Sequence, residues 1–160
     1  MQKAIEIFKN ALELEVQAEI FYEKAAEIAD DDESRMVFLE LSDMEDDHAR
    51  RIVERFKQTS FGKEFDADSW LQELEQESGK TLDMQAGEVI AKSNMREILK
   101  YAIQMETAAR DNYKSLCERF SDSEDIAYCS DLANEEQQHI NSLTQLLNSI
   151  DMDPEDRPRL

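Results

Sequence analysis

Six residues that can bind metal ions interrupt the apolar faces that the sequence predicts for four long helices. They are Glu15, Glu45, His48, Glu106, Glu136 and His139, and they include both histidines of the chain. A buried carboxylate without a compensating charge costs several kcal/mol, so such groups are normally paired, protonated or bound to metal. No Lys or Arg occupies these faces to supply that charge. The pattern therefore predicts a site for divalent cations.

Helical spacing places these residues at matching heights. A helix rises about 1.5 Å per residue, so Glu15 lies about 24 Å before the first turn between helices and Glu45 about 21 Å after it. Glu106 and Glu136 straddle the second turn with the same spacing. Within each Glu-x-x-His segment the two side chains are about 60° apart around the axis, so both can face inward. Ordinary core or surface histidines, the alternative interpretation, would not account for two such copies.

The first two helices must position half of these residues. Apolar residues at three- and four-residue steps predict a helix from about Gln2 to Ile28. We expect the second helix to begin with Asp30 as N-cap and Glu33 closing a capping box, and to end near Lys57. Residues 58–94 then form a long crossover with one or two short helices, one of them over about residues 67–77.

The third and fourth helices position the other half. Asn94, with Glu97 as its box partner, begins the third helix, and the apolar stripe of that helix continues to Phe120. Residues 121–124 form another capping box, with Ser121 as N-cap, and the fourth helix ends before Asp151.

The second half of the chain repeats the first at an offset of 91 residues, without a gap. His48 matches His139, and Tyr22 matches Tyr113. Two similar helix pairs about a pseudo-twofold axis form a four-helix bundle. The predicted fold class is therefore all-α, with two helix hairpins joined by a long crossover. Residues 1–150 form one bundle domain, and residues 151–160 form a frayed tail.

Composition and charge exclude several classes of partner. The chain has 160 residues, only three Gly and two Pro, and a formal net charge of −20, which argues against nucleic acid and anionic membrane as partners. No run of eighteen apolar residues occurs, and the amphipathic start does not resemble a signal peptide, so we expect a cytoplasmic protein. Cys117 and Cys129 form no CxxC pair and are expected to be small buried hydrophobes.

At these residues the chain resembles the rubrerythrin branch of the ferritin-like superfamily. The resemblance rests on Glu15-x6-Tyr22 and on the segments MEDDHARR and ANEEQQHI, and it covers about two thirds to three quarters of the chain. One Glu from each of two helices, with Glu-x-x-His from each of the other two, is the known arrangement of ferritin-like di-iron and di-manganese proteins. The resemblance thus implies a ferritin-like bundle holding two iron ions, with manganese or zinc as possible substitutes.

The family pattern also implies a role for each residue. Glu45 and Glu136 would bridge the two metals. The remaining four would bind one metal or the other, as the pairs Glu15 with His48 and Glu106 with His139. Tyr22 and Tyr113 follow Glu15 and Glu106 by two helical turns, and their hydroxyls are expected to hydrogen-bond a ligand carboxylate. The alternative is that both tyrosines are ordinary core aromatics.

The sequence departs from the rubrerythrin pattern in two places. It has no cysteine-rich rubredoxin domain, so electrons would come from a separate donor such as a rubredoxin-like protein. Rubrerythrins also carry a second Glu three residues after the third-helix ligand, and this chain has Ala109 there. That residue weakens the peroxidase interpretation and favours a more symmetric ferroxidase-like site.

Three functions are compatible with this pattern. The first is a di-iron oxidoreductase that reacts ferrous iron with H2O2 or O2, in oxidative-stress defence or iron oxidation. The second is iron binding and sequestration without significant turnover, and the third is a bundle that metals only stabilise. We expect a homodimer, in which the bundle forms within one chain or by exchange of helix pairs between two chains.

Overall fold

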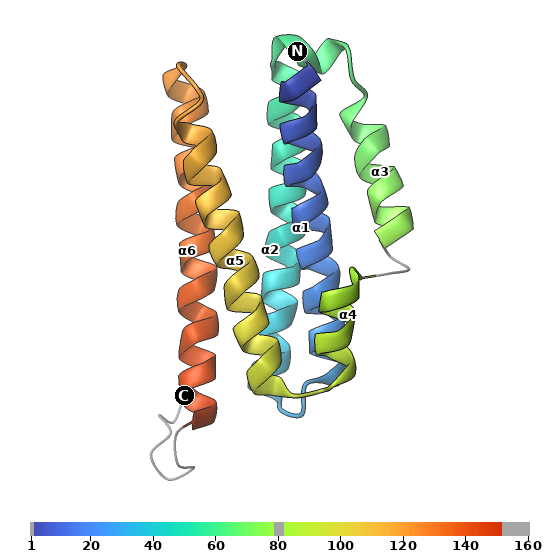
Figure 1. The fold of residues 1–160 in the computed structure, drawn as a ribbon, viewed down its shortest axis with the longest axis vertical. Coiled ribbons are helices and arrows are strands. Elements are labelled where there is room, and N and C mark those ends of the chain that lie inside the picture. Colours follow the sequence, from blue (N-terminus) through green and yellow to red (C-terminus); the bar gives the residue numbers. More distant parts are fainter. Residues whose placement is uncertain (1, 79–81, 152–160) are drawn as a thin grey trace. The chain divides into compact units, whose positions relative to one another are not determined.

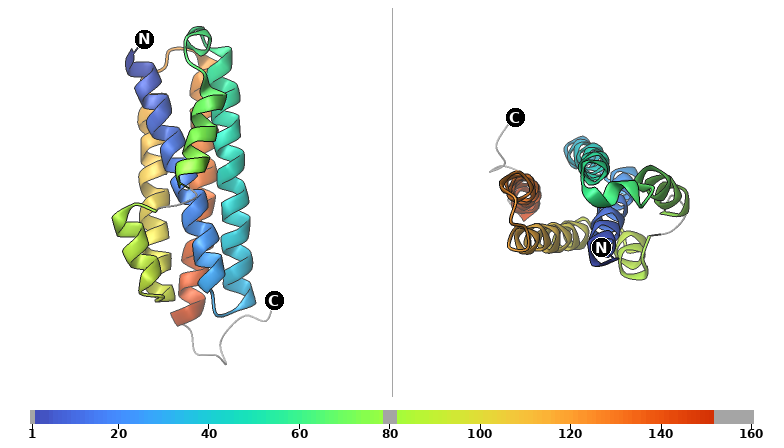
Figure 2. Two further views of the ribbon diagram at one scale, coloured as in Figure 1. Left: turned by 90° about the vertical axis from the view of Figure 1, so that its right-hand side faces the viewer. Right: turned by 90° about the horizontal axis from the view of Figure 1, so that it is seen from above.

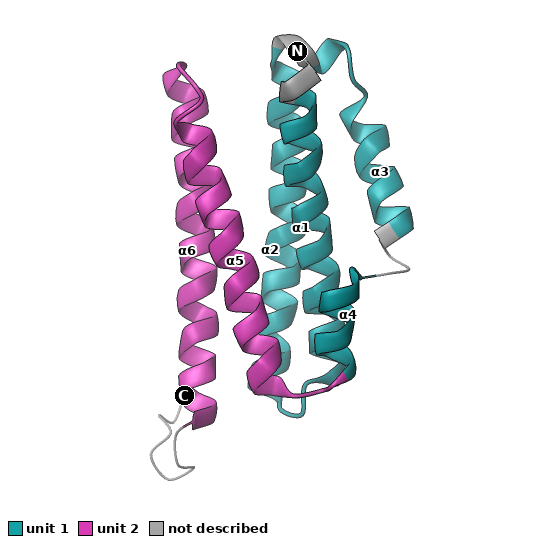
Figure 3. Cartoon of the chain, in the orientation of Figure 1, with its two compact units in different colours: residues 1–91 teal, residues 92–160 magenta. Residues whose placement is uncertain are grey.

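The computed structural model describes residues 2–78 and 82–151, and these residues form helices joined by short turns (Figure 1). In chain order the elements are α1 (Gln2–Ile28), α2 (Asp32–Gln58), the 3-10 turn η1 (Ser60–Lys63), α3 (Ala67–Ser78), α4 (Met84–Ala91), α5 (Met95–Cys117) and α6 (Ser123–Asp151). They divide into two compact units, residues 1–91 (unit 1) and residues 92–160 (unit 2) (Figure 3). The predicted all-α class with two long helix hairpins is confirmed.

Unit 1 is built on the hairpin of α1 and α2, whose long helices run side by side (Figures 1 and 2). Each helix buries one apolar stripe against the other, as the three- and four-residue spacing predicts. The buried side chains include Leu12, Phe21, Phe38, Leu41 and Val53.

The crossover packs on this hairpin through an aromatic cluster. Phe8 of α1 stacks on Phe56 of α2 with ring centroids 4.0 Å apart, and Phe65 lies 6.0 Å from both rings. Lys9 places its Nζ atom 4.3 Å from the centroid of the Trp70 ring. Contacts of this kind each contribute roughly 0.5–1.5 kcal/mol and hold α3 against α1 and α2. The helical stretch predicted at residues 67–77 is confirmed as α3.

Unit 2 consists, among its described residues, of a single hairpin formed by α5 and α6 (Figure 3). Its buried apolar side chains include Ile98, Leu99, Ala102, Leu132 and Leu143. Asn94 caps α5 as predicted, because its side-chain oxygen accepts a hydrogen bond from the Glu97 amide at 3.2 Å.

Both inter-helix turns correct the predicted N-caps by one residue. The carboxylate of Asp31, rather than Asp30, caps α2 by accepting a hydrogen bond from the Ser34 amide at 2.7 Å. Asp122, rather than Ser121, accepts bonds from the first amides of α6. In both turns an aspartate directly follows the predicted cap, and its carboxylate oxygen lies within hydrogen-bonding reach of the first helical amides.

The ends of the long helices also differ from the sequence pattern. The helix α5 ends at Cys117, so Phe120 lies beyond it and is 41% exposed, because the turn to α6 takes up residues 118–122. Asp151 is the last residue of α6. The predicted tail beyond Asp151 lies outside the described residues, and a single bundle domain over residues 1–150 stays a prediction. Within the described ranges, no helix has both the length and the apolar character needed to cross a bilayer.

Candidate metal centre

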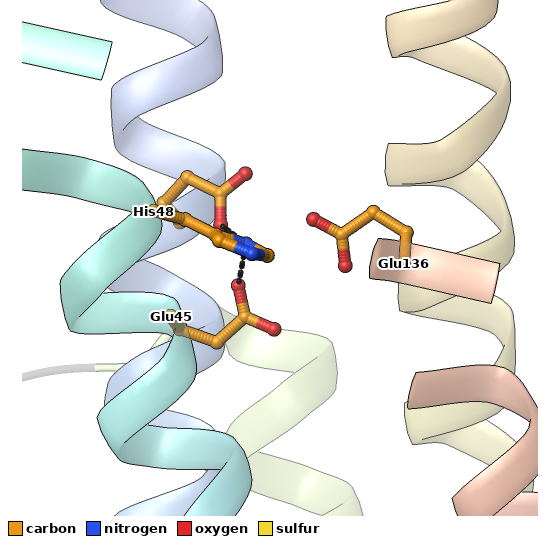
Figure 4. Close-up of side chains that lie close together, drawn as sticks. Glu45, His48 and Glu136 are labelled. Atoms are coloured by element: carbon orange, nitrogen blue, oxygen red, sulfur yellow. Dashed lines mark ion pairs between the residues drawn. The ribbon is translucent and has the colours of Figure 1, made fainter. Parts of the chain in front are cut away.

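The structure places three of the predicted ligands together in unit 1. Glu15 comes from α1, and Glu45 and His48 come from consecutive turns of α2. All three are buried, with at most 3% of each residue exposed. The Nδ1 atom of His48 lies 3.4 Å from a carboxylate oxygen of Glu45 (Figure 4). It also lies 3.4 Å from a carboxylate oxygen of Glu15. One ligand atom from each residue lies within 4.8 Å of the others, which is close enough for one ion to contact all three.

The other three predicted ligands form a second group of the same composition in unit 2. Glu106 comes from α5, and Glu136 and His139 come from α6. They are at most 4% exposed. The Nδ1 atom of His139 lies 3.1 Å from Glu136 and 3.5 Å from Glu106, and the three ligand atoms again lie within 4.8 Å of one another.

The register of the unit 1 hairpin is set close to its ligands. Ser42 is buried on α2, three residues before Glu45, and its hydroxyl donates a hydrogen bond to the backbone oxygen of Glu19 at 3.2 Å. This bond joins α2 to α1 one turn beyond Glu15. Because a buried hydroxyl needs a hydrogen-bond partner, this contact favours one axial register of α2 relative to α1.

Burial changes the acid–base behaviour of the unit 2 group. Loss of solvent raises the pKa of Glu106 to about 7, and the nearby Glu136 carboxyl raises it as well. The hydrogen bond and charge of His139 act in the opposite direction. Near neutral pH a proton therefore competes with a cation for the Glu106 carboxylate.

A polar layer lies beside the unit 1 ligands, within one helical turn of them along α1 and α2, and the sequence patterns did not single it out. Arg50 contacts Asp46 at 2.9 Å and Glu75 of α3 at 3.2 Å. Glu19 is half-buried, and its pKa rises to about 7 because it loses solvent and faces Asp46, Glu23 and Glu75, an effect that Arg50 opposes. The repeat itself could have revealed this layer, since the 91-residue offset aligns Glu19 with a basic residue, Arg110.

The two tyrosines are buried on the same helices as the first ligand of each group. Tyr22 is fully buried, and its ring contacts Phe21 and Phe38 with centroids 5.8 and 6.2 Å away. Tyr113 is 3% exposed. A hydrogen bond from either hydroxyl to a ligand carboxylate stays a prediction. Of the cysteines, Cys129 is buried and Cys117 is only partly covered, so the expectation of two buried thiols holds for Cys129 alone.

The donor atoms of both groups fit a hard or borderline divalent cation. Each group offers two carboxylates and one imidazole, which suit iron, manganese or zinc, and neither contains a thiol. The two groups together carry four carboxylates, whose charge when ionised equals that of two divalent cations. Both groups are therefore able to bind metal.

The geometry agrees with a comparison to known protein families. Residues 6–87 and 97–159 match the Rubrerythrin family, and these ranges contain all six residues of the two groups. The chain belongs to the Rubrerythrin family. Comparisons with curated proteins and with solved structures gave no match. The family assignment confirms the resemblance drawn from the sequence, and the paired long helices agree with the ferritin-like bundle expected of that family.

Proposed function

We propose that the protein is a di-iron oxidoreductase in which the two groups hold one iron ion each and ferrous iron reacts with H2O2 or O2. The observation that carries this proposal is the pair of buried, thiol-free groups of two Glu and one His in a chain of the Rubrerythrin family. Oxidative-stress defence or iron oxidation would be the physiological use. When bound, two iron ions can each give one electron to the oxidant.

Each residue has a distinct role in this proposal. Glu15 and His48 would hold one ion, Glu106 and His139 would hold the other, and Glu45 and Glu136 would contribute a carboxylate to both. The protein would be a homodimer, in which the bundle forms either within one chain or by exchange of helix pairs between two chains. These residues balance the charge of the ions and fix their position, and their burial keeps bulk water away from them.

A separate electron donor of the rubredoxin type would return the site to its reduced state. Tyr22 and Tyr113 would support ligand carboxylates through their hydroxyls. Manganese or zinc would be bound by the same donors, and zinc would give a protein without redox activity.

The second candidate is iron binding and sequestration without significant turnover. Ala109 weakens the peroxidase form of the first proposal, because no carboxylate stands one helical turn beyond Glu106 to exchange with a ligand when the metal changes its oxidation state. Ala18 occupies the equivalent position in unit 1, so both groups have the same number of carboxylates.

Single-turnover stopped-flow absorption separates these functions. Protein loaded anaerobically with two equivalents of ferrous iron is mixed with H2O2 or O2, and a reductant is then added. An oxidoreductase oxidises the iron rapidly and is re-reduced in place, whereas a storage protein accumulates or releases ferric product. Metal uptake without oxidation would contradict both and leave a structural role. Glu77→Gln, a change on the exposed face of α3, is the matched control.

A further inference from the structure

The internal repeat allows the surroundings of the two ligand groups to be compared position by position. The aligned positions beside the ligands are Glu19 with Arg110, Asp46 with Gln137, and Arg50 with Asn141. Glu19 and Arg110 each follow a predicted ligand by four residues, about 6 Å along the helix axis. Asp46 and Gln137 come directly after a ligand glutamate. The ligands are the same in both units, but these neighbours are not.

In unit 1 the neighbouring layer is acidic. Arg50 is its only cation among the residues compared, and it contacts Asp46 at 2.9 Å and Glu75 at 3.2 Å. Glu19 is close enough to interact with the same groups: burial raises its pKa most, Asp46 and Glu75 raise it further, and Arg50 lowers it. Three carboxylates thus surround one guanidinium, and the excess negative charge attracts a cation bound one turn away.

In unit 2 the equivalent layer carries one cation, one anion and two amides. Arg110 donates a hydrogen bond through Nη1 to Gln137 at 2.7 Å, and Gln137 donates to Asn141 at 3.0 Å. The Arg110 guanidinium also pairs with the neighbouring Asp111 at 2.9 Å. Arg110 and Asp111 offset each other, so this layer gives a bound cation no net attraction.

Taken as a whole, unit 1 also carries more net negative charge than unit 2. Residues 1–91 contain 24 acidic and 10 basic side chains, whereas residues 92–160 contain 14 and 8. The local layers and the wider field therefore both favour a cation in unit 1.

We propose that the two metal positions are inequivalent, and that the group of Glu15, Glu45 and His48 binds a divalent cation first and more tightly. The inference rests on the proposed function, because it requires that both groups bind metal. A unit charge about 10 Å from a divalent cation, in a partly solvated protein, changes its affinity by roughly tenfold. The unit 1 position then retains its ion, while the unit 2 position exchanges its ion with solution.

Titration of metal-free protein with Co²⁺ at pH 8, followed by visible absorption and calorimetry, tests the order of binding. We expect two steps whose affinities differ by about tenfold or more. His48→Ala should remove the tighter step and His139→Ala the weaker one, with circular dichroism confirming that each variant is folded. Two equal steps, or loss of the tighter step in His139→Ala, would overturn the inference and leave the proposed function standing. Absence of Co²⁺ binding would overturn the proposed function itself.

Charge variants test whether the layers cause the difference. Arg110→Gln should strengthen the weaker step by several-fold and Glu19→Gln should weaken the tighter one, so that each variant brings the two steps closer together. Lys114→Gln and Glu27→Gln remove the same charges from the same helices further from the ligands and serve as matched controls. If Arg110→Gln and Glu19→Gln change the two affinities no more than their controls, the charge layers do not distinguish the two positions and the inference fails.

Discussion

Units 1 and 2 carry the same three ligand types in the same hairpin setting, but they differ in almost everything around them. Unit 1 has α3 and α4 packed along its hairpin, an aromatic cluster at Phe8 and Phe56, and an acidic layer beside its ligands. The described part of unit 2 is a hairpin alone, and its equivalent layer is built from Arg110 and amides. In our proposal the ligand types determine what each group can bind, and the differing neighbours adjust how strongly it binds.

The burial of the ligand groups, which both units share, should affect stability more than the differences between the units do. Each unit buries two carboxylates and an imidazole with at most 4% exposure. Burial already raises the pKa of Glu106 to about 7, which shows that the metal-free state holds this charge at a cost. Cations that neutralise these groups should therefore stabilise both hairpins, and the differences between the units should appear as smaller effects on top of that stabilisation.

Removal of metal should produce the largest effect. At a free metal concentration about 100 times the dissociation constant, each site stabilises the folded state by roughly 2.7 kcal/mol, so two sites give about 5 kcal/mol. We expect the melting temperature, measured by circular dichroism, to fall by about 10–20 °C when a chelator replaces Mn²⁺. Equal melting temperatures with chelator and with saturating metal would show that neither unit binds a structural cation.

Loss of Glu45 or Glu136, the two carboxylates proposed to be shared, should be the next largest effect. Glu45→Ala or Glu136→Ala should weaken binding of the metal pair by roughly 100-fold or more, because even residues that only support ligands contribute 10–100-fold. Metal content after gel filtration measures the loss. Glu77→Ala, on the exposed face of α3, should retain both ions. If all three variants retain metal equally, the assignment of the shared residues is wrong.

Addition of a carboxylate to unit 2 alone should give its ligand group one more oxygen donor than the group in unit 1. Ala109→Glu places an oxygen donor one turn beyond Glu106, and it should raise the rate of diferrous decay with H2O2 by about tenfold or displace His139. Stopped-flow absorption gives the rate, and a structure of each oxidation state shows the ligands. Ala109→Gln, of similar size but uncharged, is the control. Fast decay in the unmodified protein without a gain in Ala109→Glu would restore the plain peroxidase interpretation.

The acidic layer of unit 1 should affect metal-free stability by a smaller amount. Glu19 has a folded-state pKa of about 7 against an ordinary value of 4.5, so its ionisation disfavours folding as the pH rises between these values. Glu19→Gln should leave the free energy of unfolding unchanged below pH 4.5. Above pH 7 the Glu19→Gln substitution should raise the free energy of unfolding by about 1 kcal/mol, once solvent screening of this half-buried group is included.

Urea unfolding at pH 4 and pH 8 measures the effect of Glu19→Gln. Glu27→Gln removes an exposed carboxylate from the same helix and should show no such dependence. A stabilisation by Glu19→Gln that is equal at both pH values would mean that ionisation of Glu19 is not its cause.

The long helices and the burial of the six candidate ligands could be predicted because they depend on periodicity within one helix. Glu15 and His48 stand out because each interrupts an apolar stripe, and the structure buries both. The first residue of α2 could not be predicted, because three consecutive aspartates at residues 30–32 are chemically identical as N-cap candidates. Only the path of the backbone selects Asp31 as the cap.

The outer layers could not be predicted, because they depend on contacts between different helices. Arg50 of α2 reaches Glu75 of α3 only after the crossover packs on the hairpin. The bond from Arg110 to Gln137 likewise joins α5 to α6. The sequence showed that the two halves resemble each other, but the packing of partly exposed side chains makes their surroundings differ.

The metal content at saturation tests the central claim most directly. Metal-free protein is titrated anaerobically with ferrous iron, and bound metal is measured by elemental analysis after removal of the excess. Two groups of two Glu and one His predict a value close to two ions per chain, with both lost together in a His48→Ala, His139→Ala double variant. A saturated value close to one ion per chain, or two ions retained by the double variant, would contradict the account.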